Sequence, residues 1–189
     1  MRLVPAPTSK LRPFLWFASE AEPAMKYYCR IFKGEPGEVM RTPDGEVFGT
    51  FWTMLGQDFG ALNGRDGPGF NMSISFYVDC KDQAEVDRLW KALLAAGGQQ
   101  SMCVWLQDRY GVAWQIIPKD LPKLISDPDP ARAGAAMQAM MGMRKIDVAA
   151  LHRAVDAAKP GKVTKRGKPA KGALSRKRAP ARRPPAARA

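Results

Sequence analysis

The side chains of this sequence that could take part in chemistry gather in residues 103–118. Gln115 is a polar residue in an apolar run, and Asp108 and Arg109 stand between two apolar segments. Asp at the start of a tight turn and Gly at its end favour a type I turn, and Gly111 closes this one. The pattern predicts a β-hairpin with an amide on one strand and a charged pair at its tip. Asp108 has the best claim to acid–base work, but a turn-forming role for both charged residues is the simpler interpretation.

Other candidates for nucleophilic, metal or cofactor chemistry are few. The single histidine, His152, falls in a predicted helix, where a surface position is a simpler interpretation than a base. Cys29, Cys80 and Cys103 are far apart and form no CxxC pair, so we expect reduced thiols, as in a cytoplasmic protein. The string GRDGPG at 64–69 matches neither nucleotide-binding fingerprint, and we expect no cofactor.

The net charge of +12 is confined to one end of the chain. Residues 159–189 contain 12 Lys and Arg and no Asp or Glu, so the first 158 residues are formally neutral. This tail has five prolines and no aromatic residue, a composition that predicts disorder. It could bind nucleic acid non-specifically through phosphates, without base stacking. A solubilising appendage is the alternative.

The elements that must position these side chains are predicted twice in the same order. In the first half they are strand 11–17, helix 19–32 and strands 38–42, 46–55 and 59–63. In the second half they are strand 71–79, helix 82–96, strand 99–102 and the hairpin 103–118. Each half reads βαβββ, and two such modules can enclose a shared cavity. We therefore predict an α+β fold, with the two modules forming a curved mixed sheet or half-barrel.

The remaining segments complete the predicted domain organisation. Residues 1–10 are expected to be a flexible arm and 11–120 the paired modules. Residues 121–158 form a helical extension, and 159–189 are the tail. No apolar run approaches the ~20 residues that cross a bilayer, and no signal peptide is recognised, so we expect a cytoplasmic protein without membrane contact.

Several strings within residues 11–155 resemble the vicinal oxygen chelate superfamily of glyoxalases, bleomycin-resistance proteins and extradiol dioxygenases. They are closest to its PhnB-like branch, whose members are often labelled demethylubiquinone methyltransferase. The strings are PFLWF at 13–17, AEPAMKYY at 21–28, ALNG at 61–64, FNMSISFYVDC at 70–80, EVDRLW at 85–90, WLQDRYGVAWQIIP at 105–118 and MQAMMGMRKIDVAAL at 137–151. The resemblance implies the paired βαβββ fold and a homodimer.

The superfamily holds its metal with His, Gln and Glu side chains at four cavity-facing positions. Carried over to this sequence, these positions fall on Pro13, close to Ala61, on Ser73 and on Gln115. Pro and Ala cannot bind a metal through their side chains, and Ser and Gln are weak neutral ligands. We therefore expect no catalytic metal.

Alternation along the predicted strands sets which side chains would line the cavity. If Gln115 points inward, we expect Leu15 and Phe17 to do so on the first strand, while Trp16 points outward. The predicted ligand-binding residues are Phe17, Asn63, Ser73, Trp105 and Gln115. They suit a small apolar or aromatic ligand, although each one could simply serve packing or backbone contacts.

The resulting function hypothesis is a metal-independent small-molecule-binding protein. Two alternatives stay open. One is an enzyme on the same scaffold, a lyase, isomerase or dioxygenase, and the other is a nucleic-acid-associated protein that acts through residues 159–189.

Overall fold

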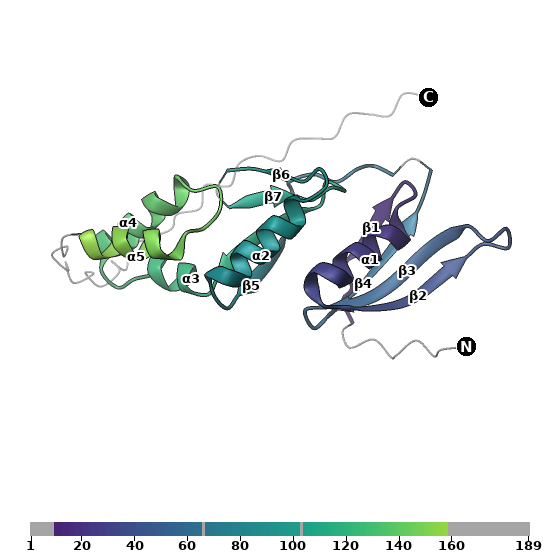
Figure 1. The fold of residues 1–189 in the computed structure, drawn as a ribbon, viewed down its shortest axis with the longest axis horizontal. Helices are drawn as coiled ribbons and strands as arrows, with labels where there is room; N and C mark the ends of the chain where they lie inside the picture. Colours follow the sequence, from purple (N-terminus) through teal and green to yellow (C-terminus); the bar gives the residue numbers. More distant parts are fainter. Residues whose placement is uncertain (1–9, 66, 103, 159–189) are drawn as a thin grey trace, which may run out of the picture.

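The computed structural model describes residues 10–65, 67–102 and 104–158. Two βαβββ modules follow one another along the chain, and three helices come after the second module (Figure 1). The predicted α+β fold class is confirmed. The tail and nearly all of the predicted arm lie outside the described residues.

The first module is built around a four-stranded mixed sheet, here called the first sheet. Its elements are β1 (Phe14–Phe17), α1 (Ala21–Phe32), β2 (Glu35–Arg41), β3 (Val47–Met54) and β4 (Gln57–Asn63). The strand order is β1-β4-β3-β2, with β1 parallel to β4 and the other pairs antiparallel. Helix α1 connects β1 to β2 at the far edge of the sheet, so the chain crosses over the sheet through a helix before β4 pairs with β1.

The second module repeats this arrangement in the second sheet, whose strand order is β5-β8-β7-β6. Its elements are β5 (Phe76–Cys80), α2 (Gln83–Leu94), β6 (Gln99–Gln100), β7 (Trp105–Gln107) and β8 (Ala113–Pro118). The predicted start of β5 at residue 71 is wrong. The carboxamide oxygen of Asn71 accepts a hydrogen bond of 2.8 Å from the backbone N–H of Ser73, and this turn delays the strand to Phe76.

The eight strands form two sheets of four rather than one continuous sheet. β1 and β5 are edge strands of their sheets, and no ladder joins the sheets within the described parts of the chain. The modules are instead joined through side chains.

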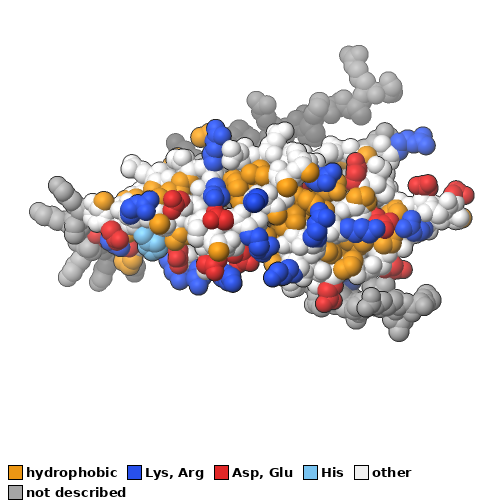
Figure 2. Space-filling view, in the orientation of Figure 1, with side chains coloured by type: hydrophobic (Ala, Val, Ile, Leu, Met, Phe, Trp, Pro, Cys, Tyr) orange, Lys and Arg blue, Asp and Glu red, His pale blue; other side chains and the backbone are white. Residues whose placement is uncertain are grey.

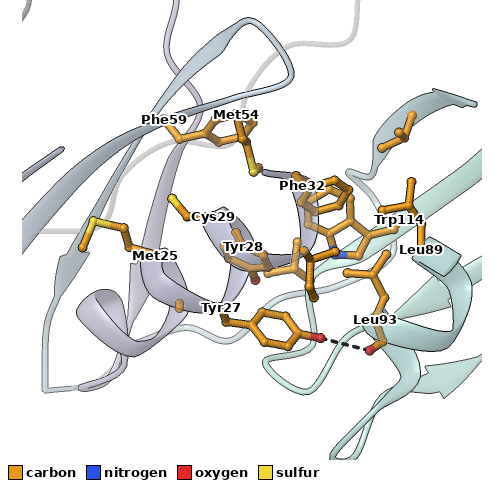
Figure 3. Packing of buried hydrophobic residues seen from close by; sticks show 14 of the residues in the cluster. Met25, Tyr27, Tyr28, Cys29, Phe32, Met54, Phe59, Leu89, Leu93 and Trp114 are labelled. Carbon is orange, nitrogen blue, oxygen red and sulfur yellow. Dashed lines mark hydrogen bonds between the residues drawn. The ribbon is translucent and has the colours of Figure 1, made fainter. Parts of the chain in front are cut away.

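One aromatic core spans both modules. Tyr28 and Phe32 on α1 contact Trp114 on β8, with ring centroids 5.6 and 4.9 Å apart (Figure 3). The Tyr27 hydroxyl lies 3.2 Å from the carbonyl oxygen of Leu93 on α2, and Arg88 donates to the carbonyl of Ile31. Helix α1 therefore packs on its own sheet and against the second module.

The C-terminal helices are α3 (Asp120–Ile125), α4 (Pro130–Met141) and α5 (Val148–Ala157). They enclose a smaller apolar cluster that reaches Ile117 on β8. Gln83 on α2 fastens them, because its side chain donates to the carbonyl of Ile146 and accepts from the N–H of Val148. Their assignment to a separate domain stays a prediction. None of the helices in the described ranges has the length and apolar character to cross a membrane.

Candidate functional site

The first sheet has one face covered by α1 and one open face, whereas the second sheet has α2 on one face and, over Ile117 of β8, the C-terminal helices on the other. On the first sheet Leu15 and Phe17 are buried in the core with α1, whereas Phe14 and Trp16 are 50% and 46% exposed. The predicted orientation of β1 is therefore wrong by one residue. All four residues of the strand are apolar, so alternation could not fix which pair faces the helix.

Two aromatic rings on the open face of the first sheet, those of Phe14 and Phe51, lie over Gly60. A Cβ on Gly60 would lie 2.5 Å from the Phe14 ring and 3.0 Å from that of Phe51. The Arg12 guanidinium lies 5.4 Å from the centre of the Phe51 ring. The absence of a side chain at Gly60 thus lets these rings lie close to the backbone and form a broad apolar surface.

The face of the second sheet that points away from α2 carries a row of three side chains, here called the Gln115 row. Tyr77, Gln115 and Trp105 are register partners on the adjacent strands β5, β8 and β7. The side-chain NH2 of Gln115 donates a 2.7 Å hydrogen bond to the hydroxyl of Ser75. The sequence predicted Gln115 and Trp105 for one site, and the register places them side by side. It missed Tyr77, although its alternation with buried Val78 was the available signal.

A cavity of about 300 Å³, here called the row cavity, opens beside this row between the two modules. Tyr77 is the member of the row that lines it, together with Ser75, which precedes β5; Pro13, Met54 and Phe59 line it from the first module. This volume is at the lower end of the range of ligand sites, and its lining is mostly apolar. The arrangement can hold a small planar group against neutral polar atoms.

The other three predicted ligand-binding residues lie elsewhere. The side chain of Asn63 accepts a 2.8 Å hydrogen bond from the N–H of Ala21 and donates to the carbonyl of Val47, so it anchors the start of α1. Ser73 is exposed in the turn before β5. Phe17 is a core residue. The five predicted residues therefore do not share one surface.

Asp108 is buried and surrounded by donors. Its Oδ2 accepts from the Tyr28 hydroxyl at 2.8 Å and the Trp114 indole N–H at 2.9 Å. Its Oδ1 accepts from the backbone N–H groups of Tyr110 at 2.8 Å and Val112 at 3.1 Å. Burial raises the pKa of Asp108, and these hydrogen bonds oppose the rise. The carboxylate therefore holds the two modules together and is not available to a ligand.

The described residues do not fit a metal centre of the superfamily type. The carried-over positions bear Pro13, Ala61, Ser73 and Gln115, and the Ala61 methyl group is buried in the core. Across residues 10–65, 67–102 and 104–158, no three His, Cys, Asp or Glu side chains are grouped as metal ligands.

The remaining reactive side chains lie away from the Gln115 row. Cys29 and Cys80 are free and buried, and burial raises their pKa values to about 11 and about 12, so both stay protonated thiols. Cys103 falls outside the described residues. His152 on α5 lies 3.7 Å from the Asp120 carboxylate, beyond both modules.

Comparison with known proteins adds relatives of the whole two-module region. A family model described as 3-demethylubiquinone-9 3-methyltransferase matches residues 9–117. A PhnB protein from Bacillus cereus, described as a candidate member of that family, is 29% identical; the match covers 58% of this chain and 99% of that one, with a TM-score of 0.53.

Two further solved structures are more distant. Protein PA1353 from Pseudomonas aeruginosa is 19% identical over 59% of this chain and 98% of that one, with a TM-score of 0.49. The fosfomycin resistance protein FosX from Listeria monocytogenes is 13% identical over 57% and 88%, with a TM-score of 0.46. Among curated proteins, none matches the chain.

Proposed function

The chain belongs to the family described as 3-demethylubiquinone-9 3-methyltransferase, and on that premise we propose a cytoplasmic small-molecule-binding protein whose ligand lies on the Gln115 row. The predicted place in the PhnB-like branch of the vicinal oxygen chelate superfamily is confirmed. The observation that carries the proposal is the row of Tyr77, Gln115 and Trp105, whose Tyr77 end lines an apolar cavity.

The chemistry of the row supports a small neutral ligand that is apolar or aromatic. Trp105 and Tyr77 offer ring faces on either side of Gln115. The side-chain oxygen Oε1 of Gln115 makes no hydrogen bond to any other described residue, so it can accept one from the ligand. No charged side chain belongs to the row, and a charged ligand would lose hydration there without a partner.

The residues at the superfamily's metal positions and in the loops before the module helices support ligand binding without a metal or a methyl donor. The metal positions of the superfamily carry side chains that bind metals weakly or not at all. The loops that precede α1 and α2, residues 18–20 and 81–82, contain no glycine of the kind that lets a nucleotide approach a helix start. An enzyme on the same scaffold stays the alternative. A turnover that is lost in Gln115→Ala while the fold is retained would favour it.

Replacing Gln115 by alanine is expected to weaken ligand binding about tenfold, because one hydrogen bond to the ligand is lost. The measurement is quenching of tryptophan fluorescence across a library of neutral aromatic compounds, followed by titration of the hits. Gln100→Ala, on the exposed strand β6, is the matched control and should bind as the unaltered protein does. Hits that bind Gln115→Ala with unchanged affinity would contradict the proposed site.

We also propose a homodimer, in which a second copy covers the open face of the first sheet. Phe14 is 50% and Trp16 46% exposed there, and contiguous apolar surface of this kind is typical of interfaces. Light scattering at micromolar concentration should give the mass of a dimer, and Phe14→Glu should give that of a monomer. Met141→Glu, on exposed α4, should stay dimeric. A monomeric unaltered protein would contradict the proposal.

A second candidate function, non-specific binding of nucleic acid, is favoured by the segregated charge. On the face drawn in Figure 2, acidic and basic side chains of the modules are interspersed, whereas residues 159–189 carry 12 cations and no acid. If about six of these cations contact phosphates, affinity for duplex DNA should fall roughly 10³-fold between about 50 and 200 mM salt. A chain that ends at residue 158 should lose this binding, and equal binding by both chains would reject the candidate.

A further inference from the structure

We propose a second ligand site, separate from the Gln115 row, that takes a small zwitterion with a planar apolar group, such as an aromatic amino acid. It is a cavity of about 220 Å³, here called the turn cavity. Segments from both modules line it. Phe17 comes from the end of β1, Glu20 from the position before α1, and Phe70 from the segment between β4 and β5, and Arg109 and Tyr110 come from the β7–β8 turn.

Four aromatic residues line the turn cavity, Trp16, Phe17, Phe70 and Tyr110, and Phe17 contacts two of the other three rings. The Phe17 ring lies 5.2 Å from that of Phe70 and 5.7 Å from that of Tyr110, both in edge-to-face geometry. The backbone at Gly67 also packs closely against the backbone at Ala18, since a Cβ on Gly67 would lie 3.0 Å from the backbone nitrogen of Ala18. Rings that pack on one another in this way give the cavity preformed apolar walls, against which the apolar group of a ligand can pack.

Each charged side chain of the turn cavity has its own support. The carboxylate of Glu20 accepts a 2.8 Å hydrogen bond from the backbone N–H of Ser19, which fixes its position. The guanidinium of Arg109 lies 5.4 Å from the centre of the Tyr110 ring. Among the described residues Arg109 makes no ion pair, so its donors remain available to a ligand carboxylate. Buried Asp108 holds the turn by accepting from the N–H of Tyr110.

The pair of opposite charges selects the ligand class. Glu20 and Arg109 line one cavity without forming an ion pair with each other. An anion would be attracted by Arg109 and repelled by Glu20, and a cation would meet the reverse. A zwitterion satisfies both charges, while its apolar group lies among the rings.

The test titrates the full-length protein with L-phenylalanine, and with benzoate and phenethylamine, which each lack one of its charges. Calorimetry should show saturable binding of L-phenylalanine and at least tenfold weaker binding of the two analogues. Amide resonances of Gly67 and Gly69 should shift on binding, because both residues line the cavity.

Two variants test the contributions of the two charged side chains separately. Arg109→Gln and Glu20→Gln should each weaken binding of L-phenylalanine at least tenfold, whereas Arg153→Gln, on exposed α5, should not change it. No saturable binding, benzoate bound as tightly as L-phenylalanine, unchanged affinity in both variants, or shifts confined to the Gln115 row would each overturn the proposal. The Gln115 row is tested with other ligands, so either site can fail without the other.

Discussion

Replacing Asp108 by alanine is expected to lower the free energy of unfolding by about 3–5 kcal/mol, which is among the largest effects of a single substitution. The variant leaves buried donors without an acceptor. They are the Tyr28 hydroxyl, the Trp114 indole N–H and the backbone N–H groups of Tyr110 and Val112. Urea denaturation followed by circular dichroism measures the loss.

Asp44→Ala is the matched control, because Asp44 is exposed in the β2–β3 turn, and it should change stability by less than about 0.5 kcal/mol. An Asp108→Ala protein as stable as this control would show that the four hydrogen bonds contribute nothing. Asp108→Asn is informative as well, because its amide oxygen can still accept from the backbone while its NH2 faces the Trp114 N–H, donor against donor.

The titration of Asp108 sets the direction in which folding stability changes with pH. Burial raises its pKa above the ordinary value of 3.8, and its hydrogen bonds oppose this only in part. The folded state therefore keeps the proton to higher pH than the unfolded chain does. This stabilising contribution is complete below about pH 3.8 and is lost as the pH rises through the raised pKa. The unaltered protein should exceed Asp108→Asn in stability by more near pH 4 than near pH 8.

Trp114→Ala should cost about 3–5 kcal/mol, because the indole is 1% exposed and its removal leaves a cavity in the shared core. Its ring contacts Phe32 and Tyr28 of the first module and Phe76 of the second. Trp114→Phe keeps most of the ring but loses the hydrogen bond to Asp108, and should cost about 1.5–3 kcal/mol. Both values come from urea denaturation.

Phe48→Ala is the control for aromatic content, since Phe48 is 53% exposed, and it should cost less than about 1 kcal/mol. If Trp114→Ala were no more destabilising than Phe48→Ala, the core would not extend across the two modules as described.

The strand and turn positions of the second module could be predicted from the sequence where polar and apolar residues alternate. In β8 a polar residue interrupts an apolar run, so Gln115 indicated which side chains point away from Trp114 and Ile116, and the turn from Asp108 to Gly111 fixed the hairpin. In β1 both faces of FLWF are apolar, and the pattern held no information about orientation. The same side chains could serve either face until α1 was in place.

Long-range contacts account for two further differences, at Asn63 and Asp108. Asn63 was a candidate ligand residue because alternation placed it on the same face as Ala61, yet its side chain accepts from the N–H of Ala21, 42 residues away. Asp108 was interpreted as a solvated turn residue because its acceptor role depends on Tyr28, 80 residues earlier. Turn chemistry and tertiary donors act on the same carboxylate, and only the first is visible in a local string.

The aromatic core shared by the modules has a thermodynamic consequence for the duplicated architecture. Tyr28, Phe32 and Trp114 bury one another, so neither half can melt without exposing the rings of the other. Residues 11–120 should therefore unfold as one cooperative unit, with calorimetric and van't Hoff enthalpies in agreement, although the sequence repeats its plan twice. The two modules are thus repeated in the sequence but are not independently stable, and an isolated half would lack the surface that closes its interior.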